Sequence, residues 1–377
     1  MFVCMDCYYR LNDCDAAREK NADRLQEEQQ FMQTIGDEEK NKVVGKKSAS
    51  RGVTIGFLLQ FTQHFNCWNW SSAEIIRKII KPSTKDARCR FVELPQMQAY
   101  TGQANTFISY AQTGKRGDMV AAILDGGADH NRCVWIDIFA IRQWPSRTPD
   151  LDFASTIENC SSFLVVRSSQ EAVEDMIEED YIAGRSELLP SEVRRQICFM
   201  RVWCLVETHK ACSMPNMPYI LKGGSHELTN DASIVKFIPN TRMLEKVVFL
   251  VNAEKVEATV ASDKEHILQG IRDGVGIEKL NSAIRGSISG ACGAAKIEDG
   301  ATIQCAACGD AEALQNVLAK KSSILGFSCG GYIGLLEKLL SHDDVNVEEA
   351  TDNQGMTSLM VASPGGHVVC IEVMWSV

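Results

Sequence analysis

A single carboxylate at the end of an apolar run is the feature of this sequence best suited to chemistry. Residues 197–206 are almost entirely apolar, and Glu207 follows them directly. We expect a buried helix there, with Trp203 one turn before Glu207 on the same face. A carboxylate beside an indole can have a raised pKa or bind ligand hydroxyl groups. Alternatively, Glu207 points to water and pairs with Lys210, because charged side chains are rarely buried.

Two further side chains that could contact a nucleotide belong to, or follow, the predicted strand 105–110. Tyr110 ends that strand, and Lys115 lies shortly after it in a Gly-Lys-Arg-Gly segment. Neither of the glycine-rich phosphate-binding motifs is present, so a phosphate loop is weakly supported. Lys115 could still contact a nucleotide phosphate or an acidic partner.

The second predicted strand, 133–139, adds an aromatic and an acidic candidate. Trp144 follows the strand, and its indole could stack on adenine or nicotinamide. Asp137 lies inside the predicted strand, so its ionised form needs a partner such as Arg142 or Arg201. Structural pairing and ligand binding are equally compatible with Asp137.

Other chemistries find little support. Cys4-x-x-Cys7 could be half of a zinc site, but no second pair and no histidine lies near it, so we expect no metal centre. No serine, histidine and aspartate set suggests a hydrolase triad. The formal net charge of −10, and basic residues that are not interleaved with aromatic ones, argue against nucleic-acid binding.

The composition predicts a cytoplasmic protein that does not enter a membrane. No apolar run approaches the ~18 residues that a membrane-spanning helix needs. The first ten residues lack the basic and then apolar pattern of a signal peptide. Fifteen cysteines in a chain of this kind indicate reduced thiols in the cytosol.

A chain of 377 residues predicts two or three domains, and the sequence changes character several times. Residues 1–50 are highly charged with both signs, which predicts a solvated helix or a disordered arm. Residues 51–100 predict a helical extension, since apolar residues between 53 and 65 repeat at helical spacing. A capping box at 71–74 opens a short helix that Pro82 is expected to stop.

Residues 101–290 predict an α/β domain with a doubly wound, flavodoxin-like parallel sheet, because strands alternate with helices. We expect the strands at residues 105–110, 133–139, 162–166 and 218–221, with a possible fifth at 246–251. The helices are expected at 118–124, 152–159, 197–210 and 263–284. Ligands of such sheets bind beyond the carboxyl ends of the strands. Glu207 should therefore lie at a cleft there, near 110–117 and 140–144.

The segment 357–362 reads TSLMVA, which matches the pattern T-P-L-H-x-A with serine for proline and methionine for histidine. This is the pattern of ankyrin repeats, and residues 301–377 resemble a short array of them. The resemblance implies α-helical pairs that present a protein-binding face, with the last repeat incomplete.

The α/β segment contains four short motifs, at residues 107–110 (FISY), 134–137 (VWID), 163–166 (FLVV) and 203–207 (WCLVE). By these motifs, of which the last is the most specific, the segment resembles a Toll/interleukin-1 receptor (TIR) domain of the algal and protist type. The segment 81–84 (KPST) also matches a stretch that precedes the first strand in those proteins. A long insertion at 170–191 departs from the family pattern.

The TIR resemblance implies two kinds of function. The first is an intracellular signalling or scaffold protein, which acts by TIR-like self-association, partly through the loop 140–150, and by binding protein partners through the repeats. The alternative is an NAD⁺ nucleosidase, in which Glu207 matches the family's catalytic glutamate and NAD⁺ is the substrate. A carboxylate suits that reaction because it can stabilise an oxocarbenium-like state. No cofactor is required in either case.

Overall fold

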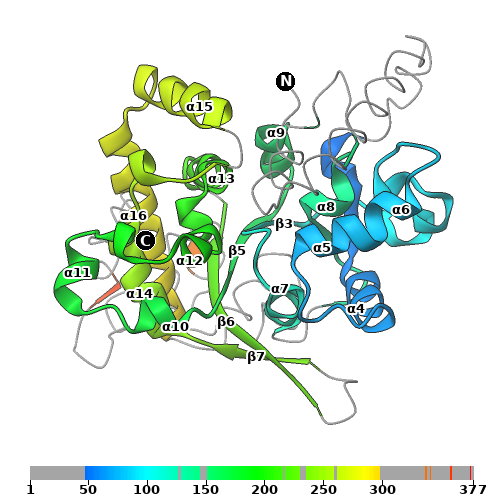
Figure 1. Ribbon diagram of the computed structural model, residues 1–377, viewed down its shortest axis with the longest axis horizontal. Coiled ribbons are helices and arrows are strands. Elements are labelled where there is room, and N and C mark those ends of the chain that lie inside the picture. Colours follow the sequence, from blue (N-terminus) through cyan, green and yellow to red (C-terminus); the bar gives the residue numbers. More distant parts are fainter. Residues whose placement is uncertain are drawn as a thin grey trace, which may run out of the picture.

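The fold is built around one seven-stranded mixed sheet with helices on both faces (Figure 1). A computed structural model describes residues 47–125, 129–144, 150, 152–214, 217–229, 235–258 and 261–297, with 336, 337, 340, 357, 358 and 374. Residues 1–46 of the predicted charged arm lie outside the described residues. The segment predicted as ankyrin-like repeats lies almost wholly outside them. Among the described residues, no helix has the length and apolar character needed to cross a membrane.

The strands follow the order β2-β1-β4-β3-β5-β6-β7. Their bounds are Gly52–Thr54 (β1), Thr101–Gly102 (β2), Thr106–Tyr110 (β3), Cys133–Trp135 (β4), Ser162–Ser168 (β5), Tyr219–Leu228 (β6) and Val235–Pro239 (β7). The central set β4-β3-β5-β6 is parallel, whereas β1, β2 and β7 pair antiparallel at the two edges. The order of the central set is compatible with a doubly wound fold. The carboxyl ends of its four strands therefore share one edge of the sheet.

The helices divide between the two faces of the sheet. Their bounds are Ile55–His64 (α4), Ser72–Ile75 (α5), Lys81–Ser83 (α6), Arg116–Leu124 (α7), Asp137–Ala140 (α8), Phe153–Glu158 (α9), Glu171–Glu174 (α10), Glu178–Ile182 (α11), Ser191–Arg195 (α12), Val202–Cys212 (α13), Thr241–Leu250 (α14), Ala261–Asp273 (α15) and Ile277–Ile297 (α16). The blue and cyan helices α4 to α7 lie on one side of the strands in Figure 1, and the green and yellow helices α12 to α16 on the other. Each face thus encloses its own apolar core.

Four aromatic rings form a ladder across the parallel strands. Phe107 of β3 stacks on Trp135 of β4 with ring centroids 4.7 Å apart, and on Phe163 of β5 at 5.4 Å. Phe163 in turn stacks on Tyr219 of β6 at 5.7 Å. Each of these pairs is also a pair of register partners in the sheet. The ladder therefore favours one register for all four strands, because a slip by one residue would turn a ring to the other face.

The predicted parallel arrangement of residues 105–110, 133–139 and 162–166 is confirmed, and the second of these segments lies between other strands. Its strand is shorter than expected, however, because β4 ends at Trp135 and α8 begins at Asp137. The sequence does not reveal this change from strand to helix, because Ile138 and Phe139 remain fully buried on the short helix and the apolar run is therefore unbroken.

Two further expectations were wrong in their local structure. Residues 246–251 are not a strand, because α14 covers Thr241–Leu250. One face of α14 is buried and carries Met243, Val247 and Leu250 at helical spacing. The apolar run at 247–251 made this spacing hard to recognise in the sequence. The helix expected at 197–210 begins only at Val202, after a 3₁₀ turn at Cys198–Met200.

The segment predicted as a helical extension also adds β1 to the sheet. Val53 lies in β1 and pairs with Val134 of β4, and α4 begins only after Thr54, whose hydroxyl accepts from the Phe57 amide. The capping box of Ser71 and Glu74 is confirmed.

Pro82 does not stop the short helix. It lies inside α6, directly after a π-helical segment at Ile76–Ile80. A wider π turn can accommodate the missing proline donor, which explains why the helix continues to Ser83.

We expect Val134→Asp to lower the free energy of unfolding by several kcal/mol, because the side chain is fully buried between β1 and β3 and a carboxylate there has no partner. Chemical denaturation measures the effect. Val134→Ala removes volume without adding charge and should cost about 2 kcal/mol. Equal costs for the two variants would contradict a buried position in the sheet.

Candidate functional site

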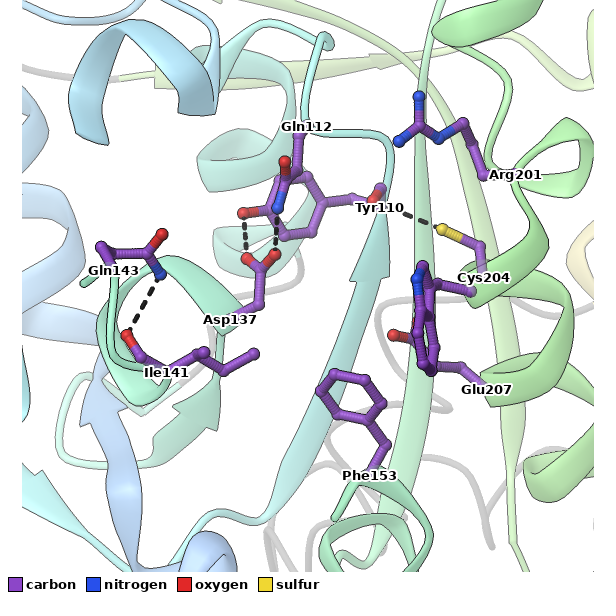
Figure 2. A pocket seen from close by; sticks show the side chains of 10 residues that line it. Tyr110, Gln112, Asp137, Ile141, Gln143, Phe153, Arg201, Cys204 and Glu207 are labelled. Atoms are coloured by element: carbon purple, nitrogen blue, oxygen red, sulfur yellow. Dashed lines mark hydrogen bonds between the residues drawn. The ribbon is translucent and has the colours of Figure 1, made fainter. Parts of the chain in front are cut away.

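A cavity opens at the carboxyl ends of β3 and β4, beside the start of α13 (Figure 2). Its volume is about 700 Å³, including the space that is open to solvent, which is within the usual range for small-molecule sites. The lining residues are Tyr110, Gln112, Asp137, Ile141, Gln143, Phe153, Arg201, Trp203, Cys204 and Glu207. The position agrees with the rule that ligands of open α/β sheets bind beyond the strands' carboxyl ends.

Glu207 projects from α13 into this cavity and is half-buried. Its Oε2 accepts a 2.6 Å hydrogen bond from the Ser109 hydroxyl of β3. Burial raises the pKa of Glu207 to about 8, although the Ser109 hydrogen bond acts in the opposite direction and the nearby Asp137 charge adds to the rise. Lys210 does not pair with it and instead lies 2.5 Å from Glu158. The carboxyl group is therefore mostly protonated at pH 7.

Asp137 is the second carboxylate of the cavity, and its position corrects an expectation. It stands at the first position of α8 rather than inside a strand, and its partners are neither Arg142 nor Arg201. The Tyr110 hydroxyl and the Gln112 amide each donate to it at 2.6 Å (Figure 2). The Ile138 backbone N–H donates to it at 2.7 Å. Three donors are what an ionised carboxylate needs when it is withdrawn from water.

Aromatic and apolar side chains form the walls around the two carboxyl groups. Trp203 lies one turn before Glu207 on α13, and its indole meets the Phe153 ring edge-on at 5.7 Å. The Cys204 thiol donates to the Tyr110 carbonyl at 3.6 Å, and burial raises its pKa well above the ordinary value. Cys204 is thus a wall residue rather than a nucleophile, because the thiolate is the reactive form.

The N-terminal extension holds one edge of the cavity in place. The Ser72 hydroxyl donates to the Tyr110 hydroxyl at 3.1 Å, which extends a hydrogen-bond chain through Tyr110 to Asp137. The Ser72 amide donates to the Gln112 carbonyl at 2.9 Å, and the Arg116 amide donates to the Trp70 carbonyl at 2.9 Å. These bonds fix the turn after β3, which carries Tyr110 and Gln112 into the cavity.

The structure brings together three of the five predicted site residues and separates the other two. Glu207, Tyr110 and Trp203 line the same cavity. Lys115 is exposed just before α7 and borders a smaller hollow that it shares with Tyr110. Trp144 is turned toward the extension, where its indole N–H donates to the Thr84 hydroxyl at 2.9 Å.

The cavity also contains residues that the sequence analysis did not select. Gln112, Gln143, Phe153 and Arg201 all line it. Gln112 and Gln143 come shortly after the predicted strands 105–110 and 133–139. Their position at the carboxyl edge of the sheet was the signal by which the sequence could have indicated them. Among the described residues, no group of histidine, cysteine, aspartate or glutamate side chains could hold a metal ion.

Comparisons with known proteins add no relative. No protein-family model, no curated protein and no solved structure matches this chain.

Glu207→Gln should stabilise the protein increasingly as pH rises from about 4.5 to about 8. Over this range the unfolded chain releases the Glu207 proton, whereas the folded protein retains it, so wild type loses stability with rising pH. Glutamine keeps the bond from Ser109 without this loss. The gain at pH 7 is at most about 3 kcal/mol, measured by chemical denaturation at several pH values.

Below pH 4.5 the two proteins should be equally stable. Glu192→Gln, on the surface of α12, is the matched control and should leave the pH dependence unchanged. A constant difference between Glu207→Gln and wild type across the pH range would show that Glu207 is not desolvated.

Proposed function

We propose that this chain is an NAD⁺ nucleosidase that breaks the nicotinamide–ribose bond beside Glu207. The observation that carries the proposal is a desolvated glutamate one turn after a tryptophan, in a cavity that a second carboxylate, Asp137, also lines. Groups with strongly shifted pKa values in a cleft are candidates for catalysis. The indole of Trp203 and the ring of Phe153 supply flat apolar surface for a heterocycle.

The reaction matches this set of side chains. When the C1′–N bond breaks, the electron pair stays on the pyridinium nitrogen, and neutral nicotinamide leaves without needing a proton. The ribosyl group becomes an oxocarbenium ion, which a neighbouring carboxylate stabilises. Water then adds at C1′ and gives up a proton, and the products are ADP-ribose, nicotinamide and H⁺. Glu207 acts as a carboxylate in this scheme, and Asp137 adds negative charge beside the cationic ring.

The raised pKa of Glu207 has a consequence for this mechanism. In the free protein the ionised form predominates only above pH 8. A bound pyridinium favours that form, since an opposite charge nearby lowers the pKa of a carboxyl group. Because kcat/KM reports the ionisation of the free enzyme, it should rise with pH up to about 8 and then level off.

A TIR-like identity for the α/β region belongs to the same proposal. The order of the central strands and the position of residues 203–207 at the carboxyl edge support it. Ankyrin-like repeats in 301–377, which would bind protein partners, are part of this proposal and lie almost wholly outside the described residues. A cytoplasmic location is proposed from the composition.

An exposed apolar surface favours a second function, protein binding within a signalling or scaffold assembly. Ile177, Ile182 and Leu188 belong to the insertion after β5 and are 60%, 51% and 57% exposed. Phe249 of α14, 43% exposed, contacts Tyr181 of the insertion with ring centroids 5.6 Å apart. Exposed large apolar side chains within one insertion are candidates for an interaction site. We propose that this surface, rather than the loop at 140–150 alone, mediates self-association.

Purified wild-type protein incubated with NAD⁺ should release nicotinamide, and Glu207→Gln should lower the turnover at least ~10²-fold, because it removes the charge that stabilises the oxocarbenium ion. Chromatography of the products measures this. Glu158→Gln is a matched control on α9, where Glu158 contacts Lys210 outside the cavity, and should retain activity. Absent nicotinamide release, or full activity of Glu207→Gln, would exclude the mechanism.

The double substitution Ile182→Asp and Leu188→Asp should abolish concentration-dependent self-association in sedimentation velocity, because it places two charges in the exposed apolar surface. Folding and NAD⁺ cleavage should be unaffected, since both side chains are exposed and lie outside the cavity. Glu178→Gln, in the same insertion, is the control. The surface has no role in self-association if wild type stays monomeric at high concentration or if the double variant associates equally.

A further inference from the structure

Gln143 has an unsatisfied acceptor at the wall of the cavity. Its side chain is 6% exposed and lines the cavity with Asp137 and Glu207. Its Nε2 donates to the Ile141 carbonyl at 3.1 Å (Figure 2). This bond sets the orientation of the amide, because a reversed amide would place two oxygens against each other. The other amide atom, Oε1, is buried without a hydrogen-bond partner.

A buried acceptor without a partner is unfavourable, and most such groups in native proteins are satisfied. An orphaned oxygen on a residue that lines a cavity therefore points to a ligand that supplies the missing donor. The donor must be an N–H or O–H group, since Gln143 Oε1 can only accept.

The charges of the cavity orient such a ligand. Gln143 and Ile141 lie on one side of the view in Figure 2, and Arg201 lies on the opposite side with Asp137 between them. Arg201 is the cationic side chain among the described residues that line the cavity. A ligand that spans the cavity would place an anionic group toward Arg201, a cationic ring near the carboxylates and a hydrogen-bond donor at Gln143.

We infer that Gln143 Oε1 accepts a hydrogen bond from the carboxamide NH₂ of the pyridinium ring. Gln143 then selects substrates that carry a primary carboxamide. This inference rests on the proposed function and adds a residue that determines its substrate specificity. A ring that carries a methyl ketone in place of the carboxamide has the same charge and nearly the same shape. It lacks the donor, so it leaves Gln143 Oε1 unsatisfied, and sites built for a hydrogen bond reject analogues that cannot form it.

The test compares NAD⁺ with 3-acetylpyridine adenine dinucleotide, which carries this ketone. The measured quantity is the kcat/KM for NAD⁺ divided by the kcat/KM for the analogue. This ratio should be at least ~10-fold larger in wild type than in Gln143→Met or Gln143→Leu. Both substitutions remove the acceptor without adding charge, and they should abolish the preference by slowing NAD⁺ cleavage selectively. Gln269→Leu, on the exposed face of α15, is the matched control and should retain the wild-type ratio.

A binding measurement separates this inference from the proposed catalysis. Calorimetric titration with free nicotinamide and with 3-acetylpyridine should show tighter binding of nicotinamide to wild type, and equal binding of the two to Gln143→Met. If NAD⁺ is not cleaved but this pattern appears, the nucleosidase proposal fails and the role of Gln143 stands. If NAD⁺ is cleaved and the ratio is the same in wild type and both Gln143 variants, the role of Gln143 is overturned. If neither compound binds and neither dinucleotide is cleaved, both proposals fall.

Discussion

The register of the four parallel strands is the constraint on which the cavity depends. The rings of Trp135, Phe107, Phe163 and Tyr219 stack in one row across β4, β3, β5 and β6. Because this row fixes how the four strands are aligned with one another, it also fixes which residues lie side by side at the common carboxyl edge. Tyr110 ends β3, and its hydroxyl lies beside the carboxylate of Asp137, which follows shortly after β4. A shift of one residue in either strand would separate that hydroxyl from its carboxylate.

Two carboxyl groups at this edge have different surroundings, and the difference determines what each can do. Asp137 accepts from two side chains and one backbone N–H, which stabilises its charge. Glu207 accepts from Ser109 alone between apolar walls, so burial raises its pKa to about 8. Pairs of acids that differ in this way can divide roles in catalysis. A cationic ligand, such as the pyridinium ring that we propose, would shift the balance at Glu207 toward the ionised form.

The segment before the parallel strands takes part in the site, although its sequence suggests only packing. Ser72 completes the hydrogen-bond chain to Asp137, and the carbonyls of Trp68 and Trp70 accept from the amides that open α7. The Arg90 guanidinium donates to both carboxylate oxygens of Asp150, and Asp150 Oδ2 also accepts from the Arg142 amide at 2.9 Å. Two turns that border the cavity are thus held from outside the parallel sheet. The insertion after β5, by contrast, lies against α14 and adds an exposed apolar surface.

The sequence alone determined the α/β class, the parallel strands around 105–110, 133–139 and 162–166, and the position of Glu207 one turn after Trp203. These features are local or periodic, and short apolar runs and helical spacing reveal them. Only the tertiary structure decided that Asp137 begins a helix, that 246–250 is helical, and that Gln143 and Arg201 line the same cavity as Glu207. An unbroken apolar run has no period by which strand and helix can be told apart. Polar side chains distant in sequence meet only once the strand register is set, and the protonation of Glu207 depends on what surrounds it, because desolvation arises from packing.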